Sequence, residues 1–238
     1  MLKLFVARVP LTVLEMLADR IEIEDRDGEL RYSAIPMQMP DIVLSNDIAE
    51  SEQYRALLRR IDNDYQSGRA YEAPRLFTLV ASDMNATAIA FLRECSGRRT
   101  DSALTFVASC VRGTGCRSLV LTDTTFTKQL LADAATVSHE LFGAVEHALF
   151  SCAVPRTTTE ELRREIRQQA EAARDTLAIG ESARDFYQKI ATEIQRIDDA
   201  KKGEEDQHAP GEDYDTRARP PPTDDTREEA ERDDERDP

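Results

Sequence analysis

The C-terminal part of the chain limits how much of it can fold. From residue 201 onward there are 15 acidic and 7 basic residues, a net charge of −8 out of −15 for the whole chain. Apart from Tyr214 and three alanines, this segment has no apolar side chain. It cannot bury enough apolar surface to offset the conformational entropy lost on ordering. We therefore predict a disordered acidic tail over residues 203–238, which leaves about 200 residues for folded structure.

The composition of the whole chain excludes some classes of protein. Hydrophobic residues make up 40% of it, which is enough for a core, while the net charge of −15 repels phosphate backbones and anionic membranes. No apolar run approaches the roughly 20 residues of a membrane span, and the first residues lack the apolar core of a secretory signal. The expectation is an intracellular, cytoplasmic protein.

The cysteines and histidines give no metal-binding pattern. Cys95, Cys110, Cys116 and Cys152 form no Cys-x-x-Cys pair, and no histidine lies at zinc-finger spacing from them. In an intracellular protein they are expected to be buried, reduced thiols. We expect neither a bound metal nor a cofactor.

Several segments have the pattern of β-strands. Residues 2–9 alternate between two faces, and residues 21–24 and 30–34 alternate on either side of Asp27-Gly28, a typical hairpin turn. Residues 76–80 and 118–121 are short continuous apolar runs, as in buried strands.

Other segments have helical spacing. Helices are expected over about residues 11–20, over 47–66, from Ser82 to about 96, and as one long helix over 123–152. Residues 101–112 fit either a helix or a strand. The prediction is a helix-rich α+β fold, in which residues 1–152 form a mixed α/β domain that ends in the long helix.

Residues 156–202 have the pattern of a helical hairpin. Thr157 and Glu160 form a capping box for its first helix, and Gly180 separates the two helices. Each helix carries a narrow apolar stripe flanked by charged residues, as at a coiled-coil seam. The predicted interaction face consists of Leu162, Ile166, Leu177, Phe186, Ile190, Ile194 and Ile197.

Two aspartates suggest an enzymatic alternative. Asp83 and Asp123 each follow an expected strand, where α/β sheets place ligands, and paired carboxylates there could hold Mg²⁺ for phosphoryl transfer or hydrolysis. Each aspartate can equally be a helix N-cap, which is the commoner role. Whether they are caps or a metal site stays open from sequence.

The segment between residues 98 and 117 is basic. It contains Arg98, Arg99, Arg112 and Arg117 but a single acidic residue, Asp101. If the loops that carry these arginines meet at one end of the fold, they form a site for phosphate or carboxylate. The acidic tail could then compete with an anionic ligand, and nucleic-acid binding would be a further alternative.

No motif in the chain names a reaction, and the features together favour a protein that is not an enzyme. We expect an interaction or structural protein, such as a scaffold, an adaptor, or a virion matrix or tegument-type protein. It would assemble with itself or with a protein partner through the hairpin over residues 156–202.

Overall fold

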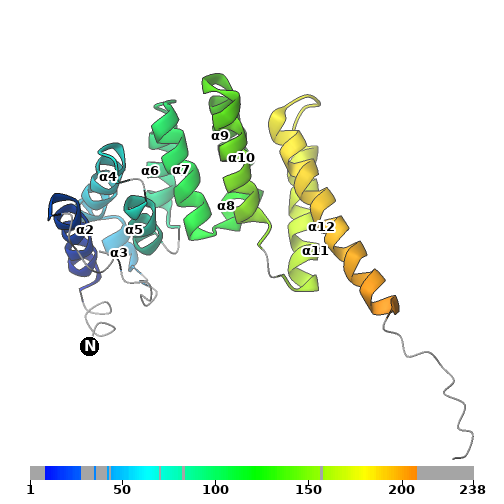
Figure 1. Ribbon diagram of the computed structural model, residues 1–238, viewed down its shortest axis with the longest axis horizontal. Coiled ribbons are helices and arrows are strands. Elements are labelled where there is room, and N and C mark those ends of the chain that lie inside the picture. The colour runs from blue at the N-terminus through cyan, green and yellow to red at the C-terminus, as the bar shows by residue number, and fades with distance from the viewer. Residues whose placement is uncertain are drawn as a thin grey trace, which may run out of the picture. The chain divides into compact units, whose positions relative to one another are not determined.

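The computed structural model describes residues 9–27, 35, 42, 44–69, 71–81, 84–155 and 158–207. The chain divides into two units, residues 1–200 and 201–238. Of the second unit, only residues 201–207 are described, and they continue the last helix. Figure 1 shows the helices in chain order. Their bounds are α2 Pro10–Asp27, α3 Asn46–Ala49, α4 Glu52–Gln66, α5 Glu72–Val80, α6 Ala86–Ser96, α7 Asp101–Thr114, α8 Arg117–Thr122, α9 Thr124–Val137, α10 His139–Ala153, α11 Glu160–Asp175 and α12 Ser182–Gln207.

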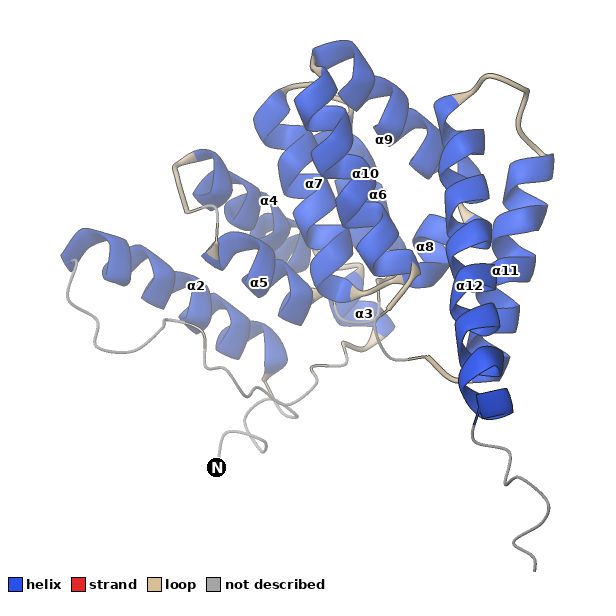
Figure 2. Ribbon diagram, turned by 45° about the vertical axis from the view of Figure 1, so that its right-hand side comes forward, coloured by secondary structure: helices blue, strands red, loops and turns tan. Residues whose placement is uncertain are grey.

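The fold is all-α, so the predicted mixed α/β domain is wrong. No strand occurs among the described residues (Figure 2). The predicted strand over residues 76–80 lies in α5, the one over 118–121 is α8, and residues 21–24 are the continuation of α2. Residues 101–112, left open between helix and strand, belong to α7. The predicted strand segments at residues 2–8 and 30–34 lie outside the described residues.

The strand prediction at 76–80 failed because a longer helical pattern includes it. The buried positions of α5 are Ala73, Pro74, Leu76, Phe77 and Val80. One face of the α5 helix contains positions 73, 76, 77 and 80, and this face is buried in the core.

None of the helices in the described part of the chain is long and apolar enough to cross a bilayer.

Polar side chains set several helix boundaries by capping. Asn85 accepts a hydrogen bond from the Ala88 amide and starts α6, three residues after the predicted cap Ser82. Ser138 accepts from the Leu141 amide, so the predicted long helix over 123–152 is divided into α9 and α10. Thr159 accepts from the Leu162 amide and starts α11, two residues after the predicted cap Thr157.

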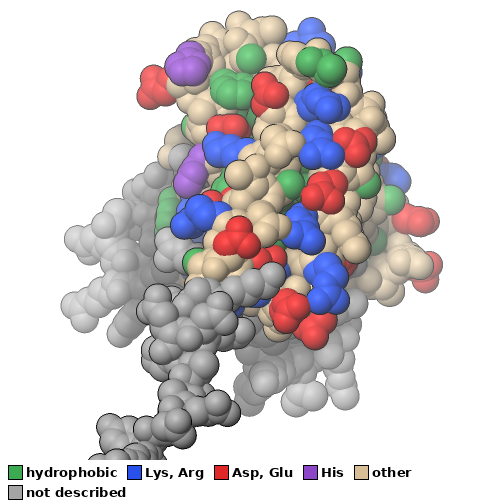
Figure 3. Space-filling view, turned by 90° about the vertical axis from the view of Figure 1, so that its right-hand side faces the viewer, with side chains coloured by type: hydrophobic (Ala, Val, Ile, Leu, Met, Phe, Trp, Pro, Cys, Tyr) green, Lys and Arg blue, Asp and Glu red, His purple; other side chains and the backbone are tan. Residues whose placement is uncertain are grey.

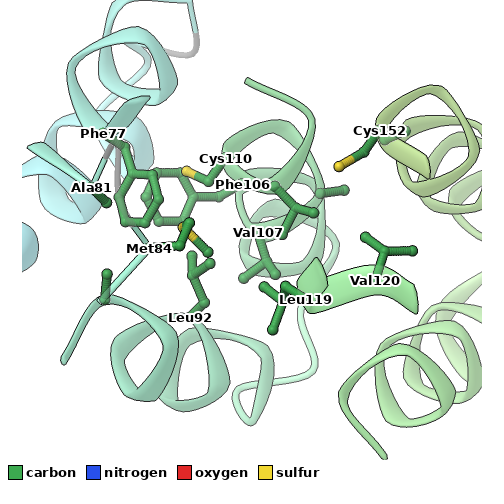
Figure 4. Close-up of a cluster of buried hydrophobic side chains, with 14 of the residues drawn as sticks. Phe77, Ala81, Met84, Leu92, Phe106, Val107, Cys110, Leu119, Val120 and Cys152 are labelled. Carbon is green, nitrogen blue, oxygen red and sulfur yellow. The ribbon is translucent and has the colours of Figure 1, made fainter. Parts of the chain in front are cut away.

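Helix α7 occupies the centre of the first unit. It contacts α4, α5, α6, α9 and α10, and in Figure 4 its side chains Phe106, Val107 and Cys110 lie between those of neighbouring helices. Phe106 is fully buried and contacts aromatic rings of three helices. The strongest packing between two helices joins α7 and α10, which are separated in the chain by α8 and α9.

The two helices of the C-terminal hairpin, α11 and α12, run antiparallel. Side-chain bonds join Arg163 to Asp198, Arg167 to Gln195 and Arg174 to Gln188, so the residue number rises along one helix as it falls along the other. Arg184 donates to the carbonyl oxygens of Arg174 and Leu177 and ties the hairpin loop to α12. Because α12 continues to Gln207, the first five residues of the predicted tail are helical.

Candidate functional site

The apolar stripe predicted as an interaction face is part of the core. Phe186, Ile190 and Ile194 have no exposed surface and Ile166 is 1% exposed, while Leu162, Leu177 and Ile197 are half-buried. The stripe is covered because the hairpin packs on the helices before it. Helix α11 contacts α8, and the Tyr187 hydroxyl of α12 donates to the Val120 carbonyl of α8 at 2.7 Å. The surface that the hairpin leaves free is polar, with acidic and basic side chains intermixed (Figure 3).

The four arginines of the basic segment do not form one site. Arg98 and Arg99 precede α7, whereas Arg112 and Arg117 lie at its other end, and a helix of 14 residues is about 20 Å long. Arg98 donates to both carboxylate oxygens of Asp62 at 2.7 Å, and Arg99 lies 3.0 Å from Asp133. Arg98 and Arg99 are therefore neutralised by nearby carboxylates. The four arginines do not form the single basic site for which the acidic tail was expected to compete with an anionic ligand.

Asp123 acts as a helix cap. Its carboxylate accepts from the Phe126 amide at the start of α9 at 3.0 Å, and Arg93 of α6 forms an ion pair with it. Asp83, the other carboxylate of the magnesium alternative, lies outside the described residues. Within the described part of the chain, no group of three histidine, cysteine, aspartate or glutamate side chains is placed to hold a metal ion.

A cleft of about 370 Å³ opens where the turn between α7 and α8 faces α11. Gly115 ends α7 in the left-handed conformation, with φ +61°, and this turn leads the chain into the cleft wall. The wall formed by α8 contributes Arg117 and Ser118, and the wall formed by α11 contributes Glu165 and Gln169. The apolar lining comes from Met84, Leu121, Leu162 and Ile166.

The cleft also contains the most exposed of the four cysteines. Cys116 is half-exposed, and its thiol lies 3.3 Å from the Ser118 hydroxyl. The other three thiols are buried. Burial raises the pKa of Cys95 and of Cys152 to about 12, and it raises the pKa of Cys110 well above the usual value. Reactivity of the native protein toward thiol reagents should therefore be confined to Cys116.

This difference gives a direct test of the fold around the cleft. At about pH 8, a thiol with a pKa of 12 is ionised in about one molecule in 10⁴, and only the thiolate is a nucleophile. We expect one rapidly reacting thiol in the native protein, four after denaturation, and none in native Cys116→Ser. The measurement is colorimetric titration with an aromatic disulfide reagent. More than one fast thiol in the native wild-type protein would contradict the described burial.

The outer face of α2 carries an apolar stripe that the strand-like pattern of residues 21–24 concealed in the sequence. Met16 and Ile23 are 47% and 46% exposed, and Val9, directly before the helix, is 43% exposed. The spacing of seven residues aligns the three side chains, since seven residues make nearly two helical turns. The opposite side of α2 carries Leu14 and Ala18, which are buried. Helix α2 is therefore apolar on two sides.

Comparison with protein-family models, curated proteins and solved structures finds no match to this chain.

Proposed function

We propose that the protein is a non-enzymatic interaction protein of the scaffold, adaptor, or matrix and tegument type, and that it associates with a second copy through the outer face of α2. The exposed stripe of Val9, Met16 and Ile23 is the observation that carries this proposal. Large apolar side chains aligned on the exposed side of a helix indicate a surface that another molecule covers.

The spacing of the stripe favours a second copy as the partner. Val9 and Ile23 lie at equal distances in sequence on either side of Met16. An antiparallel pair of α2 helices related by a two-fold axis therefore places Met16 against Met16, and Val9 against Ile23 of the second copy. Three side chains cannot supply the roughly 800 Å² per partner of a standard interface. The stripe would then be the centre of a larger contact, and association would depend strongly on concentration.

The apolar stripe of α11 and α12, which the sequence predicted as an interaction face, is not the assembly surface in this proposal. Opening it would expose Phe186, Ile190 and Ile194, which are fully buried against the rest of the unit. The hairpin instead contributes a polar flank, with a groove lined by Arg167, Arg174, Gln195 and Asp199. No described contact favours the magnesium alternative, since Asp123 already caps α9.

Solution mass tests the proposal. The wild-type mass, measured by light scattering, should rise with concentration toward that of a dimer, whereas Met16→Glu/Ile23→Glu should stay monomeric. Both positions are half-exposed, so the melting temperature should change little.

Ile179→Glu is the matched control for this test. Ile179 lies at the hairpin tip and is 92% exposed, but it is far in sequence from the stripe. This variant should associate like the wild type. A wild-type chain that stays monomeric at every concentration, or a double variant that still associates, would refute the assignment of the interface to α2.

A further inference from the structure

The cleft between α8 and α11 carries opposite charges that do not neutralise each other. Arg117 on one wall and Glu165 on the other form no ion pair, either with each other or with another residue in the described parts of the chain. Glu165 accepts a hydrogen bond from Gln169 of its own helix at 3.0 Å, and this bond leaves its charge unpaired. In a chain where most described arginines have acidic partners, this arrangement leaves one cation and one anion available to a ligand.

The rest of the lining restricts what such a ligand can be. The apolar side chains of the lining are Met84, Leu121, Leu162 and Ile166. Leu162 is half-buried and the other three are more than nine-tenths buried, so Leu162 presents most of the apolar surface that a ligand can reach. A simple anion would be repelled by Glu165, and a simple cation by Arg117. A zwitterion with an apolar body satisfies both charges and places its apolar part on the apolar lining. The volume of about 370 Å³ is in the range of small-molecule sites and is large enough for one amino acid.

We propose that this cleft binds a free apolar α-amino acid. The carboxylate would pair with Arg117, whose planar guanidinium suits two-point contact with a carboxylate. The ammonium group would pair with Glu165, and the side chain would lie against Leu162, the half-buried apolar residue of the lining. The proposal is independent of self-association through α2.

The probes are leucine, methionine and phenylalanine, together with two analogues of leucine that each lack one charge. Isocaproate has no amino group, and isoamylamine has no carboxylate. Calorimetric titration of the full chain should detect binding of at least one amino acid, and the bound ligand should slow alkylation of Cys116, which lines the same cleft. Each leucine analogue should bind at least about tenfold more weakly than leucine, because each lacks one charged hydrogen-bonding group.

Matched variants assign each charge to its side chain. Arg117→Gln should weaken leucine binding at least about tenfold, but it should not weaken isoamylamine binding, because it removes a charge that repels this cation. Glu165→Gln should likewise weaken leucine binding at least about tenfold without weakening the binding of isocaproate, an anion that Glu165 repels. Arg112→Gln and Glu161→Gln are the control variants. Each removes an exposed charge that is near Arg117 or Glu165 in sequence but does not line the cleft, so both variants should bind leucine like the wild type.

Two results would overturn the proposal. One is that none of the three amino acids gives heat or protects Cys116 in the folded wild-type protein. The other is that isocaproate binds as tightly as leucine and Glu165→Gln has no effect on either, which would mean that the ammonium group is not recognised. An unchanged melting temperature of each variant shows that a loss of binding is not a loss of folding.

Discussion

Replacing Phe106 by alanine is expected to lower the free energy of unfolding by about 3–5 kcal/mol, a large part of the total stability of a domain. Phe106 is fully buried in α7. Its ring centroid lies 5.0 Å from that of Tyr65 in α4, 6.3 Å from Phe77 in α5 and 6.4 Å from Phe91 in α6. Truncation leaves a cavity where four helices meet, and it removes three aromatic contacts at once. Denaturant titration followed by circular dichroism measures the loss.

Two further variants separate the contributions to this loss. Phe106→Leu keeps most of the volume and should cost clearly less than the alanine variant. Phe142→Ala removes the same side chain from a half-buried position in α10, and it should cost less than about 2 kcal/mol. If Phe106→Ala were no more destabilising than Phe142→Ala, the packing described around α7 would be incorrect.

The strand predictions failed because short apolar runs do not distinguish a buried strand from a buried helix. Residues 118–121 lie in α8, which has only six residues and is too short to show a helical period. For residues 76–80, the helical spacing becomes visible when the residues before the apolar run are included, since Ala73 belongs to the same buried face. The nine residues of α5 together show this helical period, whereas the five residues of the run do not.

The alternation at residues 21–24 has a different cause. Ile21 belongs to the inner face of α2 and is buried, whereas Ile23 belongs to the exposed outer stripe. Apolar residues on two sides of one helix produce the every-second-residue pattern of a strand. The feature that misled the fold prediction is therefore the one that now supports an interaction surface on α2.

The candidate sites depended on distances that the sequence does not supply. Arg98 and Arg117 would lie close together if residues 101–112 turned back on themselves, but α7 separates them as one helix of 14 residues. The cleft depends on the contact between α8 and α11, whose cleft residues lie about 40 to 50 positions apart in the chain. The sequence around Arg117 and the sequence around Glu165 do not indicate that these two residues line the same cleft.

The second large effect is expected at the ion pair that joins the two helices of the hairpin. The side chain of Arg163 is 5% exposed, and its guanidinium pairs with Asp198 of α12 and donates to the Thr158 carbonyl at 3.0 Å. Asp198→Ala leaves a buried cation without its counter-ion, so the free energy of unfolding should fall by about 3 kcal/mol. The measurement is denaturant titration, with hydrogen exchange to locate the loosened helices in α11 and α12.

A neighbouring aspartate and an apolar replacement show whether this loss comes from the unpaired charge. Asp199 is exposed, and among the described residues it accepts a hydrogen bond from Gln195 of its own helix alone, so Asp199→Ala should cost less than about 0.5 kcal/mol. Arg163→Met/Asp198→Leu removes both charges and fills the space, and it should be more stable than Asp198→Ala, because no buried charge is left unpaired. If Asp198→Ala cost no more than Asp199→Ala, the Arg163–Asp198 pair would contribute nothing net to stability. The apolar stripe that was predicted as a docking face, together with bonds such as that of Tyr187 to Val120, would then hold α12 in place.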